Sequence, residues 1–314
     1  MPEVGGRNHP AIAVIGPTAS GKSDLALALA DRFRGEIVVC DALQVYRHMD
    51  IGTAKPGVEA RARIPHHMLD LRDPCVDFSA GDYLRLSREV LDEIKARCRT
   101  PFVVGGTGFY LKALIEGLFA GPGRSEELRR RMRNIVAKRG PAILHRALRR
   151  IDPETAAKLA PADAERNIRA YEIYLVTGQT MSSWQARPRD SLSGFRWLKL
   201  GILWPRTQLY ARIDQRVEEM FRQGFVAEVE ALTKEFPREC HAFKAIGYRQ
   251  IAGYLEGRFS LEAAIEDIQR ESRRYAKRQT TWFRSNREIV WLDATLGAEA
   301  VLELASSAVA RFLA

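Results

Sequence analysis

Apolar and polar residues follow two kinds of pattern along the chain. Short, nearly continuous apolar runs bounded by glycine, proline or charged residues are typical of strands buried in a sheet. Between them lie stretches with apolar residues every three or four positions, such as residues 78–97, where Tyr83, Leu91 and Ile94 share one face of a helix. The apolar runs are residues 11–15, 36–40, 101–104, 198–204 and 289–292. This succession predicts an α/β fold in which a parallel sheet is flanked by helices.

The pattern changes after Gly121-Pro122-Gly123, because no strand pattern appears from there until about residue 198. Asp152-Pro153 is typical of a helix start, and Gly178 is typical of a helix end. The helices predicted in this part of the chain are residues 126–139, 142–150, 153–160 and 164–177. We therefore expect two domains: an α/β core of residues 1–123 and 195–314, and a helical insertion domain of residues 124–194.

The first apolar run leads directly into a glycine-rich loop and then a helix. Residues 16–23 fit G-x-x-x-x-G-K-[ST], the phosphate-binding loop, in which loop amides and a helix N-terminus point at one anion. Lys22 supplies a charge to the terminal phosphates, and the Ser23 hydroxyl can bind Mg²⁺. The sequence thus predicts a P-loop NTPase-like core that binds a phosphate or diphosphate, without specifying ATP; a plain glycine-rich turn is the alternative. The predicted phosphate contacts are Gly16, Pro17, Thr18, Ala19, Ser20, Gly21, Lys22 and Ser23.

Two polar residues follow the next predicted strands. Asp41 ends the run that begins at Glu36, and Thr107 follows residues 101–104 within Gly105-Gly106-Thr107-Gly108. Ligands of open α/β sheets bind beyond the carboxyl ends of the strands, so both side chains are expected beside the phosphate-binding loop. From the residues alone, an acidic turn residue or helix cap at Asp41 and a capping threonine at Thr107 remain alternatives.

Charge points to a polyanionic partner. The chain has 49 Lys and Arg against 39 Asp and Glu, a net charge of +10. Residues 124–150 hold ten Lys or Arg and two acids, and a second basic stripe from Arg270 to Lys277 continues into Trp282, Phe283 and Arg284. Cations followed by aromatic side chains suit phosphate contacts combined with base stacking. A solvated basic face is the alternative.

Other residue types exclude several kinds of site. The four cysteines are scattered without a C-x-x-C pair, so we expect reduced thiols, no disulfide framework and no zinc site. His66 and His67 have no third ligand at a useful spacing, which favours packing or polar orientation over metal binding. No apolar run approaches the length of a membrane span, and Met1–Pro10 does not resemble a signal peptide. We therefore expect a cytoplasmic protein without a membrane partner.

These features together fit an enzyme that acts on nucleic acid with a phosphorylated co-substrate. A P-loop kinase or ATPase and a non-catalytic RNA-binding protein remain alternatives at this point. Seven blocks, in order, resemble those of the tRNA dimethylallyltransferases, also called tRNA isopentenylpyrophosphate transferases, over nearly the whole chain. The blocks are residues 16–23, 41–47, 50–56, 64–70, 104–110, 246–250 and 277–282.

The resemblance implies transfer of a dimethylallyl group from dimethylallyl diphosphate to N6 of adenine 37, next to the anticodon of tRNA. It implies that the phosphate-binding loop holds diphosphate, with Lys22 neutralising the leaving group and Ser23 assisting Mg²⁺. Asp41 matches the general base, and Thr107 and Arg129 match positions that contact tRNA near the reacting centre. The implied catalytic residues are thus Asp41, Lys22, Thr107 and Arg129. The implied tRNA contacts are Asp41, Ala42, Leu43, Gln44, Thr107, Arg129, Glu165, Arg166, Asn167, Ile168, Arg169, Lys244, Ala245, Ile246, Gly247, Tyr248, Arg249, Lys277, Arg278, Gln279, Thr280, Thr281, Trp282 and Arg284.

One residue departs from the family pattern. Ala42 stands where serine is usual in the family, which removes one hydrogen bond near the general base Asp41. The chain also lacks the C-terminal zinc finger of many eukaryotic members, so we expect a bacterial-type enzyme. The related adenylate isopentenyltransferases act on free nucleotides, and the two basic regions argue against that activity. The partners implied are the tRNA anticodon stem-loop and dimethylallyl diphosphate, with Mg²⁺ as cofactor and a monomeric state.

Overall fold

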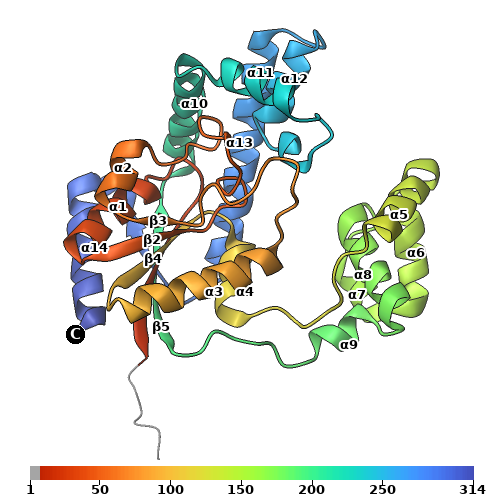
Figure 1. Ribbon diagram of the computed structural model, residues 1–314, viewed down its shortest axis with the longest axis horizontal. Coiled ribbons are helices and arrows are strands. Elements are labelled where there is room, and N and C mark those ends of the chain that lie inside the picture. The colour runs from red at the N-terminus through yellow and green to blue at the C-terminus, as the bar shows by residue number, and fades with distance from the viewer. Residues whose placement is uncertain (1–7) are drawn as a thin grey trace, which may run out of the picture. The chain divides into compact units, whose positions relative to one another are not determined.

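Six parallel strands form the sheet of the computed structural model, which describes residues 8–314 (Figure 1). Their order is β3-β2-β4-β1-β5-β6, so the strand that precedes the glycine-rich loop lies inside the sheet. The register pairs Val14 of β1 with Val104 of β4 on one side and Leu200 of β5 on the other. The strands are β1 (His9–Ile15), β2 (Gly35–Val39), β3 (His66–His67), β4 (Thr100–Gly105), β5 (Phe195–Leu203) and β6 (Ile289–Asp293). The predicted α/β fold is confirmed.

Helices flank this sheet. The helices α1 (Lys22–Arg32) and α14 (Ala298–Leu313) lie beside each other at the left of Figure 1, where Arg32 pairs with Glu303. The helix α3 (Ala80–Ala96) begins at Ser79, whose hydroxyl accepts the Asp82 amide in a capping box. The shorter α2 (Val58–Arg63) and α4 (Gly108–Glu116) complete this part. Apolar residues of the sheet and of α1, α3, α4 and α14 form one continuous core.

A second group of helices follows β5 in the chain: α10 (Arg206–Arg222), α11 (Phe225–Glu235), α12 (Tyr248–Leu255) and α13 (Leu261–Arg284), with 3₁₀ turns η1 (His241–Lys244) and η2 (Ala294–Leu296). Apolar periodicity in the sequence predicts helices over 207–224 and from Ser260, and both are observed. The sequence indicates Gly224 only as a helix end, so α11 is not predicted. Gly224 adopts φ +96° and is the N-cap of α11, directly after Gln223, the C-cap of α10.

Residues 116–191 form a compact unit of their own, and residues up to 115 and from 192 form the other. We call them the insertion unit and the core unit. The insertion unit holds α5 (Glu126–Arg139), α6 (Ala142–Ile151), α7 (Pro153–Lys158), α8 (Ala164–Thr177) and α9 (Met181–Gln185), and it contains no strand. Its core includes Met132, Leu144 and Ile168. The predicted domain limits were 124 and 194, whereas these units divide at 116 and 191.

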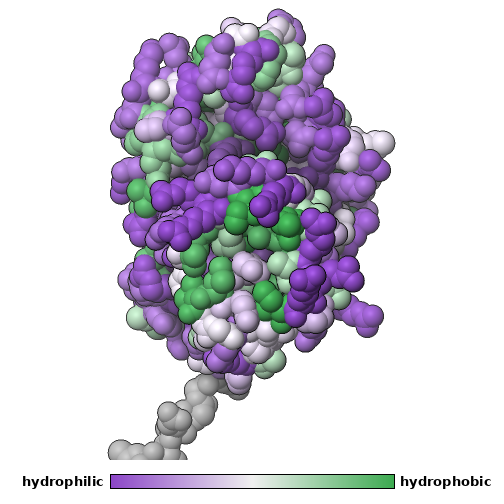
Figure 2. Space-filling model, turned by 90° about the vertical axis from the view of Figure 1, so that its right-hand side faces the viewer, coloured by the Kyte–Doolittle hydropathy of each residue, from purple (hydrophilic) through white to green (hydrophobic). Residues whose placement is uncertain are grey.

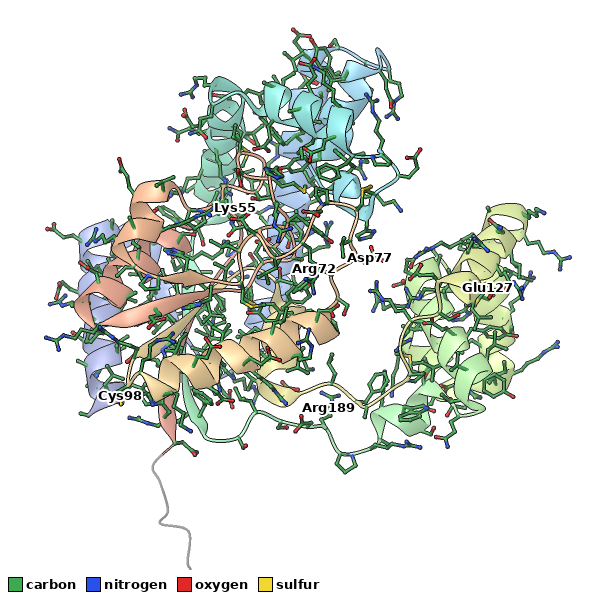
Figure 3. All side chains as sticks on the ribbon, viewed as in Figure 1. Lys55, Arg72, Asp77, Cys98, Glu127 and Arg189 are labelled. Atoms are coloured by element: carbon green, nitrogen blue, oxygen red, sulfur yellow. A yellow bond between two sulfur atoms is a disulfide. The ribbon has the colours of Figure 1, made fainter. Side chains whose placement is uncertain are left out.

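The cysteines differ from expectation, because Cys75 and Cys240 form a disulfide across 165 residues of sequence. Each lies in an irregular segment. The pairing depends on how the fold brings these two segments together, and the spacing of cysteines in the sequence does not indicate it. Cys40 is buried and free, and Cys98 is free and exposed in the turn after α3 (Figure 3). The paired histidines make polar contacts, as expected: His67 contacts Glu36 at 2.7 Å, and His66 contacts the Ile64 carbonyl at 2.7 Å.

Hydrophilic residues cover most of the face shown in Figure 2, with a smaller apolar area near its middle. Within residues 8–314, no helix combines the length and the apolar character needed to cross a bilayer. The part of the expectation about a signal peptide that concerns residues 1–7 lies outside the described residues.

Candidate active site

A cavity of about 510 Å³ lies in the core unit, where β1, β2 and β4 end. Its walls come from the loops after these three strands and from α10, α13 and the segment before α12. The structure therefore brings together residues that the sequence placed in separate motifs. The predicted site residues that line the cavity are Thr18, Ala19, Lys22, Ser23, Asp41, Ala42, Leu43, Gln44, Lys244, Ala245, Ile246, Gly247, Arg278 and Gln279.

The phosphate-binding loop joins β1 to α1 and is fixed by side chains from distant elements. The Trp204 indole donates to the Ser20 carbonyl at 3.0 Å, and Arg212 Nε donates to the Ala19 carbonyl at 3.0 Å. Gly21 adopts φ +87° directly before α1 begins at Lys22, a conformation that other residues adopt at a cost. The loop amides and the helix N-terminus are therefore held in place for an anion.

Two cations stand in this part of the cavity, Lys22 and Arg216 of α10. Burial, together with the nearby Arg216 charge, lowers the pKa of Lys22 to about 8. Burial also lowers the pKa of Arg216, against the opposing charges of Asp41 and Asp24. Arg216 Nε is buried and has no hydrogen-bond partner among residues 8–314. Two crowded cations, one with an unused donor, favour binding of a multiply charged anion.

The sequence analysis missed Arg216, although one signal was present. On α10, Arg216 occurs three residues after Ile213 and four before Met220, and both of these are buried. A cation on the apolar side of an amphipathic helix is expensive to bury and suggests a specific ligand. The helical periodicity of residues 206–222 therefore indicates Arg216 as a candidate ligand-binding residue.

Asp41 holds the opposite charge in the same cavity. Its Oδ1 accepts the Leu43 amide at 2.9 Å and the Gln44 amide at 3.4 Å, so the turn that follows β2 fixes the carboxylate. Its Oδ2 has no hydrogen-bond partner within residues 8–314 and remains able to accept a proton from a ligand. An oriented carboxylate with one unused oxygen is suited to general base catalysis.

Thr107 contacts the turn that carries this carboxylate. Its Oγ1 accepts the Ala42 amide at 3.2 Å, which ties the loop after β4 to the turn after β2. Because this bond uses the backbone of Ala42, it does not need the serine that is usual at this position. Burial, with the Asp41 charge, raises the pKa of Tyr275 to about 12, so its phenol remains a hydrogen-bond donor.

Gln279 of α13 links the two glycine-rich loops. Its Oε1 accepts the Thr18 amide at 2.9 Å, and its Nε2 donates to the Gly106 carbonyl at 2.9 Å. A Cβ at Gly106 would overlap Gln279, and a Cβ at Gly105 would overlap the Cys40 carbonyl. Burial raises the pKa of Cys40 to about 12, which excludes this thiol as a nucleophile at neutral pH.

Several predicted tRNA contacts have buried side chains: Arg129, Asn167, Ile168, Tyr248 and Gln279. Arg129 donates to the fully buried carboxylate of Glu172 through Nε and Nη2, at 3.1–3.2 Å. Asn167 donates to the Asp163 carbonyl at 2.7 Å. In this structure these side chains pack and form hydrogen bonds in the interiors of the two units. Of the same segment, Glu165 and Arg166 are exposed and ion-paired, with Arg133 and Asp163 respectively, and Arg169 pairs with Glu172.

The basic stripe on α13 divides into two parts. Arg270, Arg273 and Arg274 each pair with an acid, whereas the exposed Lys277, Arg278 and Arg284 have no ion-pair partner in the described chain. Trp282 is 46% exposed and packs where a Cβ on Gly108 would lie. Thr280 and Thr281 donate to carbonyls of their own helix. The unpaired cations and the exposed indole lie at the end of α13 that contacts the glycine-rich loop.

The residues present fit Mg²⁺ only with help from a ligand. No group of three His, Cys, Asp or Glu side chains within residues 8–314 could hold a metal ion alone. The exposed Ser23 hydroxyl and the Asp41 carboxylate line the same cavity. Protein sites for Mg²⁺ commonly provide one or two such oxygens and take the rest from phosphate and water.

Comparisons with known proteins agree on one family. Residues 44–286 match the family described as IPP transferase. The chain is 49% identical to the tRNA dimethylallyltransferase of Solibacter usitatus, with 97% of this chain and 99% of that protein covered, and 44% identical to that of Geobacter sulfurreducens, with 94% and 95% covered.

Solved structures are similar as well. The full-length tRNA isopentenylpyrophosphate transferase of Bacillus halodurans gives a TM-score of 0.73 at 37% identity and 97% coverage of both chains. A eukaryotic dimethylallyltransferase acting on tRNA gives a TM-score of 0.76 at 29% identity, over 91% of this chain and 74% of that one.

Proposed function

The chain belongs to the IPP transferase family, and we propose that its cavity moves a dimethylallyl group from dimethylallyl diphosphate to N6 of adenine 37 in tRNA, beside the anticodon. One observation supports this reading above all. A phosphate-binding loop with Lys22 and a carboxylate with an unused oxygen, Asp41, line the same cavity. The transfer releases a diphosphate anion from the donor and a proton from the acceptor amine. It therefore needs an anion-binding loop and a proton-accepting carboxylate in one cavity.

The residues around the loop bind the leaving group. The amides of Gly21, Lys22 and Ser23 and the side chains of Lys22 and Arg216 meet the diphosphate, and Trp204 and Arg212 fix the loop that carries these amides beforehand. As the allylic C–O bond breaks, negative charge grows on the diphosphate oxygen. Cations and amides that are already in position stabilise this charge without reorganising. Ser23, together with the diphosphate, would hold Mg²⁺, which would supply further positive charge to stabilise the leaving group.

Asp41 accepts the proton of the amine. As N6 of adenine forms its bond to the allylic carbon, it loses one proton, and Oδ2 of Asp41 is the acceptor. The Leu43 and Gln44 amides hold Oδ1 and fix the direction of Oδ2. General base catalysis of this kind contributes about 10²–10⁴-fold. Thr107 holds the turn that carries Asp41, and the phenol of Tyr275 stays protonated beside it.

The adenine has to leave its stack to reach this carboxylate. We propose that Lys277, Arg278, Trp282 and Arg284 contact the anticodon stem-loop, together with Lys244, Arg249 and exposed cations of the insertion unit. All of these side chains except Trp282 are exposed cations, and Trp282 offers a partly exposed ring on which a nucleobase can stack. The proposal includes a monomeric enzyme that works in the cytoplasm, where tRNA is available.

The test is an acceptor and donor comparison. Purified protein is incubated with isotope-labelled dimethylallyl diphosphate and either tRNA or adenosine monophosphate, and nucleosides are analysed by mass spectrometry. The proposal predicts N6-(dimethylallyl)adenosine in tRNA alone and no need for ATP. Label on free adenosine monophosphate but not on tRNA would contradict it, and so would ATP hydrolysis without any transfer.

A further inference from the structure

A carboxylate outside the residues discussed so far holds a loop of the cavity. Glu228 of α11 accepts three consecutive backbone amides, those of Asp50, Ile51 and Gly52, at 2.9, 2.6 and 3.2 Å. Residues 50–55, which we call the latch loop, contribute Gly52, Thr53 and Ala54 to the cavity wall. The contact therefore runs from a helix that was not predicted to a wall of the active site.

Tyr248 supplies a fourth donor to the same carboxylate. Its hydroxyl donates to Glu228 Oε1 at 2.7 Å, and its ring is fully buried against Phe225 at a centroid distance of 5.1 Å. Gly52 lies directly against these two rings, where a Cβ would overlap Phe225. Because four donors converge, only a side chain with acceptors and no donor satisfies all of them, and an ionised carboxylate is such a group.

The other end of the latch loop is held by Lys55, whose side chain is 1% exposed. Its ammonium donates to the Tyr46 carbonyl at 2.7 Å and pairs with Asp70 at 2.7 Å and Asp50 at 2.6 Å. Figure 3 labels Lys55 in the core unit. A lysine with three donors makes three bonds here, so it has none left for a ligand. The latch loop is thus fixed at one end by the partly buried Glu228 and at the other by the buried ammonium of Lys55.

This fixation determines the orientation of Gln44 in the cavity. Gln44 Nε2 donates to the latch-loop carbonyls of Thr53 and Ala54, at 3.0 and 3.2 Å. Both partners are carbonyl oxygens, which can only accept hydrogen bonds. The NH₂ group of Gln44, the donor of this amide, must therefore face them. The Oε1 atom of Gln44 is then the one left for a ligand, and it can accept a hydrogen bond from an N–H of a base.

We propose that Glu228 is a positioning residue for the acceptor base: through the latch loop it fixes the Gln44 amide so that Oε1 faces the tRNA adenine. The proposal rests on the proposed transfer to tRNA. Glu228 does not contact substrate itself. It acts on the acceptor side of the cavity, whereas the diphosphate is held by residues 16–23, which Glu228 does not contact.

The experiment compares Glu228→Gln with Glu230→Gln. Both residues are on α11, but Glu230 is exposed and pairs only with Lys234 on the surface. We expect Glu228→Gln to lower kcat/KM for tRNA about 10–100-fold, because small misplacements of a positioning group have effects of this size. Its Kd for dimethylallyl diphosphate should stay within about twofold, and Glu230→Gln should match wild type in both.

A double-mutant cycle adds a readout that a purely structural role would not change. If Glu228 acts through Gln44, then Glu228→Gln in a Gln44→Ala background should lower kcat/KM by less than about twofold further. Losses that multiply fully would overturn the proposal, and so would a diphosphate affinity that falls in parallel with kcat/KM. Should Glu228→Gln fail to fold, Tyr248→Phe removes one donor bond and keeps the ring, and a smaller loss confined to tRNA is expected.

The outcomes separate this inference from the proposed function. If wild type and Glu230→Gln both transfer no dimethylallyl group to tRNA, the proposed function has failed. If both transfer it and Glu228→Gln does so at an equal rate, the function stands and the role given to Glu228 is wrong.

Discussion

Lys22 shows at the scale of one residue how surroundings change chemistry. A surface lysine keeps its charge up to about pH 10, whereas burial and the neighbouring Arg216 lower the pKa of Lys22 to about 8. In the free enzyme it therefore loses its proton within the range where many assays are run.

We predict that affinity for dimethylallyl diphosphate falls as pH rises through about 8. Below that pH, Lys22 is charged and meets the anion; above it, binding must first bring back a proton, so affinity declines by up to about tenfold per unit. Phosphate groups titrate near pH ~6, so titrations between pH 7 and 9.5 isolate the lysine. In Lys22→Arg the charge persists, and the profile should be flat whatever its absolute affinity. A flat profile in wild type would refute the assignment.

Asp41 is the proposed general base, and Asp41→Asn keeps its shape while removing proton acceptance. We predict a single-turnover rate lower by about 10²-fold or more, with affinities for tRNA and diphosphate within a few fold of wild type. Rapid-quench measurements with saturating substrates test this. A rate within threefold of wild type would require another base.

The residues that the sequence located differ from those it missed in a physical respect. Lys22, Asp41 and Thr107 each follow a strand in a recognisable loop, so local pattern and sheet topology were sufficient. Arg216 was not predicted, and its place in the cavity depends on the packing of α10. Gln279 was predicted only as a tRNA contact that the resemblance implies, and its link between the two glycine-rich loops depends on the packing of α13. The disulfide between Cys75 and Cys240 depends on the same kind of long-range packing.

The helix α13 shows at the next scale how one element serves two purposes. Toward its start, arginines pair with Asp267, Glu271 and Asp214, and toward its end Lys277 and Arg284 are exposed without ion pairs to any of residues 8–314. The sequence predicted one basic stripe without this division. The i,i+3 spacing indicates the pairs of Arg270 with Asp267 and of Arg274 with Glu271, whereas the pair of Arg273 with Asp214 depends on the packing of α13 against α10.

We predict that Lys277→Ala with Arg284→Ala weakens tRNA binding and flattens its salt dependence by up to about 2 units, because unpaired cations that contact phosphates release counterions. The matched control is Arg270→Ala with Arg274→Ala, which removes the same charge from ion-paired positions on the same helix. The measurement is a log–log plot of tRNA Kd against salt. Equal slope changes in both double variants would mean that the weaker binding comes from the lower net charge of the protein and not from lost contacts to tRNA phosphates.

The interior of the insertion unit gives a second element-scale prediction. Burial would raise the pKa of Glu172, but hydrogen bonds from Arg129 and Arg169 hold it below its ordinary value. Removing Arg129 leaves a buried carboxylate with fewer partners.

We therefore predict that Arg129→Ala destabilises the insertion unit by about 3 kcal/mol. Hydrogen exchange of α5 and α8 amides in the full chain should speed up, while Arg130→Ala, an exposed neighbour, changes nothing. A variant with unchanged exchange and lost turnover would instead assign Arg129 a direct contact with tRNA.

Considered as a whole, the molecule distributes the features of the proposed function over two units. The core unit contains the cavity, the phosphate-binding loop and Asp41, and the insertion unit contains many exposed cations on a small helical core. The alternation of strands and helices predicted this division, since the strand pattern stops and resumes. The limits differ by a few residues because connecting segments without regular structure carry no periodic pattern.

One measurement tests the central claim, transfer to a single adenine, most directly. Two tRNA transcripts are compared that differ only at position 37, with adenine or guanine, and each is incubated with protein and labelled dimethylallyl diphosphate. Digestion and mass mapping then locate the label. The account predicts one dimethylallyl group, on N6 of adenine 37, and no label on the guanine transcript. Label at other positions, or equal labelling of both transcripts, would contradict it.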